Sequence, residues 1–307
     1  MRNAFIERLS QLAEFDSRLF LVTGDLGFGV LEDFARRFPR QYLNAGVAEQ
    51  NMSAVATGLA LEGHIVFTYS IGNFPTLRCL EHLRNDACYH GANVKVVSVG
   101  GGFSYGQLGM SHHATEDLSI MRALPGIRVC APASRFETRG AIDAVIALEG
   151  PAYLRLERAA AGFDDRSSNP FVFGRARVLR DGPDLTLIGT GGIVAELVAA
   201  AESLDAMGVQ CRVISLHTIK PLDTDSLIAA AEQTGGILTV EENTVLGGLG
   251  GAVAEACLEH GVRPRKFHRL GIHDSYTSVV GDQNFLRAVV GIDRRAIVDA
   301  ARQLLEP

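Results

Sequence analysis

Residues 44–52, Asn-Ala-Gly-Val-Ala-Glu-Gln-Asn-Met, place a single carboxylate, Glu49, between a short apolar run and a helix. The helix is expected over 49–62, and its small, nearly all apolar side chains are typical of a buried helix. Charged side chains are rarely buried without a partner. Glu49 therefore has either a capping role at the helix N-terminus, worth ~0.3–1 kcal/mol, or a chemical role that explains its burial.

The composition fits a large protein with two domains. The chain has 307 residues, of which 47% are hydrophobic, enough for two separate cores. The formal net charge of −6 and the scattered Lys and Arg residues argue against nucleic acid or an anionic membrane as a partner. No apolar run approaches the ~20 residues of a membrane span, and the N-terminus lacks a signal-peptide core. We expect a soluble, cytoplasmic protein whose five cysteines are reduced and bind no metal.

Strands and helices are predicted to alternate along the chain, from apolar runs and from helical periodicity. Alternation of this kind implies mainly parallel sheets covered by helices on both faces. The expected strands are 19–23, 42–45, 64–69, 94–99, 127–130, 152–156, 185–189, 211–216 and 236–240. The expected helices are 3–15, 31–38, 49–62, 74–90, 115–124, 134–148, 193–206, 224–234 and 252–260.

The predicted fold class is α/β, with two doubly wound, mainly parallel-sheet domains. Small and polar residues at 161–175 are expected to form a linker between a domain at 1–160 and a domain at 176–307.

Several polar residues of the first domain follow predicted strands directly. They are Asp25, Glu49, Tyr69 and the residues of the Gly-rich loop 100–113. Because ligands of such sheets bind beyond the carboxyl ends of the strands, this convergence predicts a functional site there.

Two Gly-rich turns of the second domain have simpler explanations than ligand binding. Residues 189–194 lack the third Gly of a dinucleotide fingerprint and an obvious acidic ribose ligand, so a tight turn between strand and helix is favoured. The turn at 247–251 could cradle an anion, but close helix packing explains it more economically. The chain contains no serine-hydrolase elbow and no Walker-type loop.

His112 and His113 lie in the Gly-rich loop of the first domain. Adjacent histidines point in different directions and do not easily chelate one metal ion. They are either structural residues that bond to the backbone, or proton shuttles and donors near a polar substrate.

The segment 46–52, Gly-Val-Ala-Glu-Gln-Asn-Met, followed by 106–112, Gly-Gln-Leu-Gly-Met-Ser-His, resembles the C-terminal half of transketolase. The pattern is shared with deoxyxylulose-phosphate synthase and with the beta subunits of 2-oxo-acid dehydrogenases. The resemblance extends over nearly the whole chain, through 118–125, 151–158, 216–222 and 240–242.

This resemblance implies a pyrimidine-binding domain at 1–160, a transketolase C-terminal domain at 176–307, and thiamine diphosphate as cofactor. Glu49 matches the catalytic glutamate of the family, which bonds to a ring nitrogen of the aminopyrimidine. A buried carboxyl with a raised pKa can share a proton with that ring. The favoured tautomer then removes the proton from the thiazolium carbon, and the cofactor stores the carbanion.

The resemblance also implies roles for other residues. The pyrimidine should stack on an aromatic ring, for which Phe74 is the first choice and Tyr69 the second, and Asp25 lies near the same cofactor. His112 matches a residue that contacts substrate, with His113 beside it. Arg2 and Arg158 match arginines that hold a sugar phosphate.

Three positions depart from the family pattern. Gly100 and Gly29 stand near the places of a phosphate-binding His and Ser, and Leu108 replaces an Asp that senses the donor. The usual pair of phosphopentose substrates is therefore not the one the sequence favours.

The Mg²⁺ and diphosphate motif of the family, Gly-Asp-Gly followed further on by Asn, is missing at Gly24–Leu26 and at Gly281–Gln283. The metal ligands are therefore expected on a separate diphosphate-binding subunit, with the active site between chains of an α2β2 assembly. The isolated chain should bind the cofactor weakly and turn nothing over.

The leading functional hypothesis is the beta subunit of a split transketolase-like enzyme that transfers a two-carbon ketol unit between sugars. One alternative is a different enzyme that uses the same cofactor. It would be either a carboligase for an activated or deoxy sugar, or the beta subunit of a 2-oxo-acid dehydrogenase or decarboxylase. A second alternative is a catalytically silent binding or scaffold protein with the same fold. The sequence does not indicate the sugar, its phosphorylation or its nucleotide.

Overall fold

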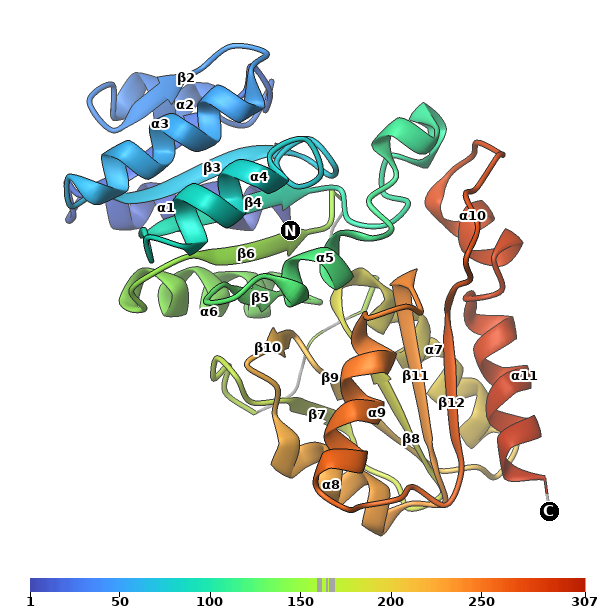
Figure 1. The fold of residues 1–307 in the computed structure, drawn as a ribbon. Helices are drawn as coiled ribbons and strands as arrows, with labels where there is room; N and C mark the ends of the chain where they lie inside the picture. Colours follow the sequence, from blue (N-terminus) through green and yellow to red (C-terminus); the bar gives the residue numbers. More distant parts are fainter. Residues whose placement is uncertain (159–161, 164, 166–168, 307) are drawn as a thin grey trace.

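The computed structural model describes residues 1–158, 162–163, 165 and 169–306. They form two sheets with helices on both faces, which confirms the predicted α/β class with two mainly parallel sheets (Figure 1). Of the predicted linker 161–175, residues 161, 164 and 166–168 lie outside the described residues, as do the domain ends at 159–160 and 307.

The first sheet has seven strands in the order β10-β5-β6-β4-β3-β1-β2. Its parallel strands are β1 (Leu19–Thr23), β2 (Tyr42–Asn44), β3 (Ile65–Ile71), β4 (Val94–Val99), β5 (Arg128–Cys130) and β6 (Ala152–Leu156). The remaining strand, β10 (Thr218–Lys220), comes from the second half of the chain and pairs antiparallel with β5. The two halves of the chain therefore share one sheet, a feature that strand–helix alternation did not predict.

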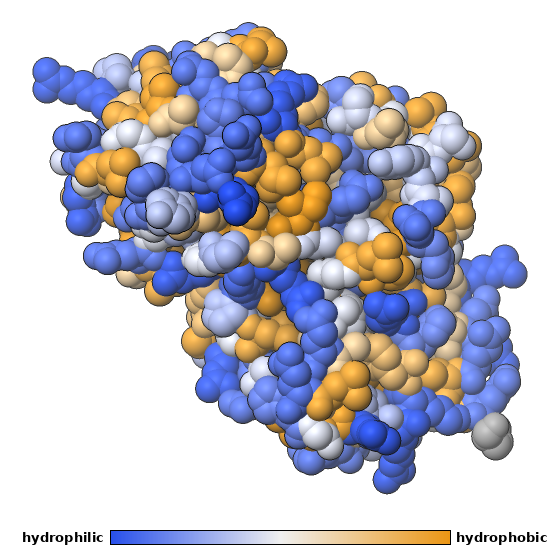
Figure 2. All heavy atoms as spheres, in the orientation of Figure 1, coloured by the Kyte–Doolittle hydropathy of each residue, from blue (hydrophilic) through white to orange (hydrophobic). Residues whose placement is uncertain are grey.

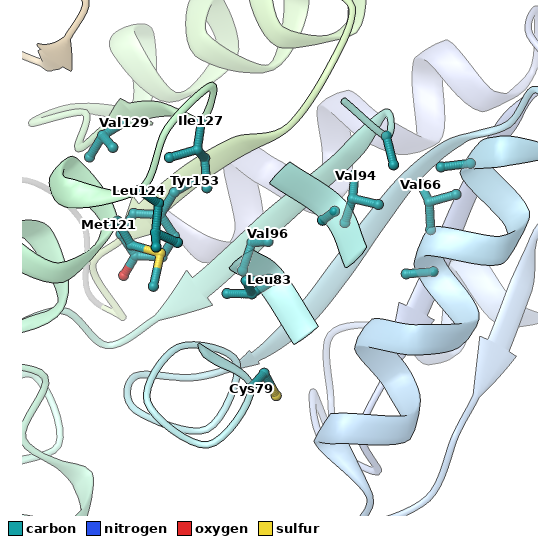
Figure 3. Close-up of a cluster of buried hydrophobic side chains, with 14 of the residues drawn as sticks. Val66, Cys79, Leu83, Val94, Val96, Met121, Leu124, Ile127, Val129 and Tyr153 are labelled. Carbon is teal, nitrogen blue, oxygen red and sulfur yellow. The ribbon is translucent and has the colours of Figure 1, made fainter. Parts of the chain in front are cut away.

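Helices cover both faces of this sheet because alternate strand residues point to opposite sides. One face packs against α1 (Arg2–Ala13), α2 (Glu32–Arg37) and α6 (Arg135–Ala147). The other packs against α3 (Glu49–Leu61), α5 (Asp117–Ala123) and the helical segment 80–88. Figure 3 shows the second of these clusters, in which Leu83 lies beside Val96, with Val94 and Val66 on one side and a group from the neighbouring elements on the other: Met121, Leu124, Ile127, Val129 and Tyr153.

The second sheet has the order β12-β11-β8-β9-β7. Its strands are β7 (Arg177–Arg180), β8 (Leu185–Gly189), β9 (Cys211–Ser215), β11 (Ile237–Thr244) and β12 (Phe267–Ile272), and among these five only β7 and β9 pair antiparallel. One face packs against α7 (Val194–Asp205) and α11 (Arg294–Leu305), the other against α8 (Thr224–Gln233) and α9 (Leu249–Glu259). The short helix α10 (Gln283–Val289) lies on the side of the first domain (Figure 1).

The helix predicted at 74–90 is wrong in its first part. Turns occupy residues 72–79, and the helical segment begins only with α4 (Leu80–His82) and continues as a π-helix, η1 (Leu83–Cys88). The N–H of Arg78 bonds to the carbonyl oxygen of Asn73, five residues back, and the N–H of Cys79 bonds to that of Thr76, three residues back, whereas an α-helix bonds four residues back. Phe74 and Arg78 therefore lie in turns at the carboxyl end of β3.

No helix among the described residues is long and apolar enough to cross a membrane. On the face drawn in Figure 2, hydrophilic and apolar residues are interspersed over both domains.

Candidate functional site

Glu49 begins α3 at the carboxyl edge of the first sheet. The chain reaches it from β2 through Gly46, whose φ of 76° suits glycine. The carboxylate is buried, with 2% of the residue exposed, and its Oε2 accepts a hydrogen bond from Arg78 Nη1 at 2.7 Å. Gly24 lies against it, because a Cβ there would stand 3.2 Å from Glu49 Cγ. The partner of this buried acid is thus a side chain from the 72–79 turn, outside its own helix.

Phe74 and His112 complete a cluster around the same point. The guanidinium of Arg78 lies over the Phe74 ring, 4.5 Å from its centroid, and the His112 ring meets the edge of Phe74 at a centroid distance of 5.2 Å. Burial, and then the nearby His113, lower the pKa of His112, and Ser111 Oγ lies 3.0 Å from its Nδ1. The structure therefore brings three predicted residues, Glu49, Phe74 and His112, together around Arg78.

Tyr69 lies deeper in the protein than Phe74. Its ring packs nearly parallel to Phe5 at 5.9 Å inside the core, only 2% of the residue is exposed, and burial raises the pKa of its hydroxyl. Its backbone carbonyl accepts a hydrogen bond from Thr23. Phe74, which is half-buried and borders Arg78 and His112, is therefore better placed than Tyr69 to stack on a ligand.

Asp25 is tied to the segment that leads to Glu49. Its φ of 57° is unusual for a residue other than glycine. Asn44 holds this conformation, because its amide donates to Asp25 Oδ1 at 2.9 Å while its Oδ1 accepts from the backbone N–H groups of Asp25 and Gly46. Asp25 therefore helps to fix the turn beside the site. It is partly exposed at the edge of the site.

Arg2 and Arg158 both lie near enough to Tyr105 for their charges to act on its hydroxyl. The Arg158 guanidinium lies 5.4 Å from the centre of the Tyr105 ring, and Arg2 Nε is buried with no hydrogen-bond partner among the described residues. Burial raises the pKa of Tyr105, and the charges of Arg158 and Arg2 oppose that shift. Tyr105 also explains Gly100, because a Cβ at that position would stand 2.2 Å from the Tyr105 ring. A tyrosine thus fills the place where the family resemblance predicts a histidine side chain.

His113 points away from His112. It is buried, its Nε2 lies 3.2 Å from the carbonyl oxygen of Gly106, and its ring meets the edge of Phe103 at 5.1 Å. These contacts match the structural alternative for one histidine of the pair, and the structure does not place His113 in the cluster around Arg78.

Sequence reasoning missed Arg78 and Tyr105. Arg78 follows Phe74 by four residues, but the expected regular helix hid the turn that brings Arg78 to Glu49 and over the Phe74 ring. Tyr105 lies inside the Gly-rich loop, where no periodicity marks it. Across the described ranges, no group of three or more His, Cys, Asp or Glu residues is arranged to hold a metal ion.

The fold and the cluster together define a class: a two-domain α/β protein that offers a buried carboxylate, an aromatic ring and a histidine at the carboxyl edge of a parallel sheet. Residues 1–162 match the transketolase pyrimidine binding domain, and residues 174–297 match the transketolase C-terminal domain. The chain therefore belongs to the transketolase family.

Relatives that this chain matches along nearly their whole length include proteins named as transketolase subunits. The 6-deoxy-6-sulfo-D-fructose transketolase subunit SqwH of Clostridium sp. (strain MSTE9) is 36% identical over 307 residues, covering 100% of this chain and 94% of that protein. A subunit of the apulose-4-phosphate transketolase of Phocaeicola vulgatus is also 36% identical, covering 99% and 97%. A solved structure described as a split gene transketolase, inactive beta4 tetramer, is 34% identical with a TM-score of 0.90, covering 99% of this chain and 97% of that one.

Proposed function

We propose that this chain is the C-terminal subunit of a split, thiamine-diphosphate-dependent transketolase that transfers a two-carbon ketol unit between sugars. The observation that carries the proposal is the buried Glu49 at the carboxyl edge of the sheet, which Arg78 links to Phe74 and, through that ring, to His112. The full-length similarity to subunits of divided transketolases supports it. The domain boundaries 1–160 and 176–307 belong to this proposal, and the cytoplasmic location stays a prediction from the sequence.

The residues present fit the aminopyrimidine part of the cofactor. A buried acid that is bonded to a planar guanidinium lying over Phe74 can instead bond to a planar heterocycle stacked on the same ring. When bound, thiamine diphosphate supplies a nucleophilic carbon and stores the electron pair of the transferred unit. Glu49 would hold a proton against the pyrimidine ring nitrogen, Phe74 would orient that ring, and Asp25 would border it.

His112 and the two arginines would act on the substrate. Burial lowers the pKa of His112 and so favours the neutral imidazole, which can both accept a hydrogen bond from a sugar hydroxyl and donate one to it. Arg2 and Arg158 put two permanent positive charges beside Tyr105, which suits an anionic group at the far end of a sugar.

A phosphate is not the only anion that fits. Tyr105 fills the place of the family's phosphate-binding His, so a substrate with a different terminal anion, or a deoxy sugar, is the second candidate. The 2-oxo-acid dehydrogenase or decarboxylase alternative has no comparable observation in its favour.

The diphosphate and Mg²⁺ are assigned to a partner subunit that carries Gly-Asp-Gly and Asn, in an α2β2 assembly. The oxygen ligands that Mg²⁺ prefers are not clustered within the residues described for this chain.

The test is to purify the chain with its partner subunit and assay ketol transfer in the presence of thiamine diphosphate and Mg²⁺. The donors are fructose 6-phosphate, apulose 4-phosphate and 6-deoxy-6-sulfo-D-fructose, with products identified by mass spectrometry. Replacing Glu49 by Gln should lower kcat by about 10²–10⁴, the range typical of acid–base groups. Glu62→Gln, at the exposed end of the same helix, is the matched control and should leave the rate unchanged.

Two outcomes would contradict the proposal. Full activity of Glu49→Gln would favour a silent scaffold. Tight, Mg²⁺-dependent binding of thiamine diphosphate by the isolated chain, measured by calorimetry, would remove the need for a partner subunit.

A further inference from the structure

The loop that carries His112, residues 103–113, is closed at its base by a short antiparallel bridge. Gly102 and Ala114, the residues that flank the loop, exchange two backbone hydrogen bonds of 2.8 and 2.9 Å. The position of His112 therefore depends on what holds this base.

One end of the base is held by Glu242, which lies near the end of β11 in the second sheet. Only 2% of Glu242 is exposed, and its Oε1 accepts a hydrogen bond from the backbone N–H of Phe103 at 2.6 Å. Its Oε2 is paired with Arg287, with nitrogen–oxygen distances of 2.6 and 2.8 Å. The amide of Gln283 donates to both carboxylate oxygens. A buried carboxylate with these partners is a rigid, charge-assisted acceptor for the loop backbone.

The other end of the base is held by the same strand. Arg155 Nη2 donates to the carbonyl oxygen of Ala114 at 2.9 Å and to the carbonyl oxygen of Glu242 at 2.7 Å. The N–H of Thr244 donates to the carbonyl oxygen of Thr115 at 2.6 Å. Strand β11 of the second sheet therefore holds both ends of a loop that belongs to the first domain.

The fit between Glu242 and the loop leaves no spare room. A Cβ at Gly102 would stand 2.5 Å from Glu242 Cγ, and the φ of Gly102 is +56°. The glycine thus lets the carboxylate approach the backbone at the point where the loop begins.

We propose that Glu242 is a positioning residue, which fixes the 103–113 loop so that His112 meets the edge of Phe74 beside Glu49. This inference rests on the proposed function, because it assigns Glu242 an effect on the reaction through His112. It gives the second domain a part in the active site, through a carboxylate that bonds to Phe103, Gln283 and Arg287 and acts on His112 only by way of the loop.

The experiment uses the full chain assembled with its partner subunit and the same three ketose donors. Glu242→Gln should lower kcat/KM by about 10–100-fold, since a misplacement of about 1 Å at a reacting group can have an effect of this size. The Kd for thiamine diphosphate should stay within about two-fold, because Glu49 and Phe74 are not held by Glu242. In a His112→Ala background, Glu242→Gln should have less than about a two-fold further effect, because the residue it positions is gone.

Glu241→Gln is the matched control. Glu241 is the neighbouring buried acid of β11, but its carboxylate accepts from the N–H groups of Leu249 and Gly250 and does not touch the loop. It should leave kcat/KM unchanged. Glu242→Asp is the second variant, since it keeps a charge for Arg287 and withdraws the oxygen from Phe103; it should show the same dependence on His112.

Three outcomes would overturn the inference: additive losses for Glu242→Gln and His112→Ala, an equal loss for Glu241→Gln, or failure of both Glu242 variants to fold. Activity of Glu49→Gln would instead overturn the proposed function. If Glu49→Gln is inactive while Glu242→Gln and His112→Ala are additive, only the role of Glu242 fails.

Discussion

Arg78 meets both parts of the candidate cofactor site at once. Its Nη1 is 2.7 Å from Glu49 Oε2, and its guanidinium lies 4.5 Å from the centre of the Phe74 ring. A heterocycle that stacks on Phe74 and bonds to Glu49 must enter the volume that this guanidinium fills. Because the Arg78 side chain is 47% exposed, it can swing out into solvent when the ring enters.

We therefore expect Arg78→Met to tighten the binding of thiamine diphosphate. Removing the competing guanidinium takes away a half-exposed ion pair worth about 1 kcal/mol, which corresponds to roughly five-fold in Kd. Calorimetry on the assembled enzyme measures the change. Arg84→Met is the control, because Arg84 is exposed and bonds to Asn85. Weaker binding by Arg78→Met would mean that Arg78 helps to hold the cofactor.

Among the individual site residues, those that could be predicted from the sequence are the ones whose residue type is unusual at its position. A carboxylate at the start of an apolar helix and a histidine in a Gly-rich loop are conspicuous, so Glu49 and His112 could be found. Arg78 and Tyr105 could not, because an arginine after an aromatic residue and a tyrosine in a loop are common on any surface. Only the turn at 72–79 and the close approach of Tyr105 to Gly100 reveal their roles.

At the N-terminus of α9, a side chain from strand β11 accepts hydrogen bonds from the N–H groups that have no partner within the helix. The N–H groups of Leu249 and Gly250 donate to the Glu241 carboxylate at 2.7 and 2.8 Å, so the anion that suits this helix end comes from the chain itself. A Cβ at Gly248 would stand 2.0 Å from Glu241 Oε2, which explains a glycine of this turn by close packing. Burial raises the pKa of Glu241 to about 7 and outweighs these two N–H bonds, which favour the anion and lower the pKa.

This pKa predicts a pH-dependent stability difference between the protein and Glu241→Gln. A carboxyl whose pKa is higher in the folded state contributes stability that is fully present below about pH 4.5 and is lost as pH rises through about 7. The unfolding free energy of the protein relative to the variant should therefore fall between about pH 5 and 7, by at most about 1.4 kcal/mol per pH unit. Urea unfolding followed by circular dichroism tests this, and parallel pH curves would contradict it.

Helices and strands were predicted well where their hydrophobic pattern is regular. They were predicted poorly where turns interrupt the pattern. The buried parallel strands are continuous apolar runs, so their places could be predicted. The 74–90 segment has enough apolar residues for a helix, but the backbone hydrogen bonds of its first residues, such as that from Arg78 to Asn73, have the spacing of turns. Strand β11 continues past the apolar run to Thr244, because Glu241 and Glu242 find buried partners there.

The two domains are joined by more than a linker. Strand β10, from the second half of the chain, extends the first sheet, and β11 holds the loop of the first domain. Sequence patterns could not predict these contacts, because each one depends on the packing of one domain against the other.

A buried ion pair crosses the same boundary. Arg177 of β7 donates to Glu137 of α6 at 2.8 Å, and their side chains are 1% and 0% exposed. Glu137 also accepts from the N–H of Ala133 and the hydroxyl of Ser215, and Arg177 pairs with Asp165. Both charges are thus taken out of water, and the bond between them exists only while the domains stay together.

Arg177→Met should lower the free energy of unfolding by about 3–5 kcal/mol, because it removes the cation that Glu137 and Asp165 share at a buried site. The double variant Arg177→Met with Glu137→Gln should recover part of this loss, since no unpaired charge remains at Glu137. Arg139→Met removes an ion pair with Glu7 whose side chains are 55% and 54% exposed, and should change stability by less than about 1 kcal/mol. Urea unfolding of the three variants measures the differences. If Arg177→Met behaves like Arg139→Met, the pair does not hold the domains together, and the shared sheet and the β11 contacts must do so alone.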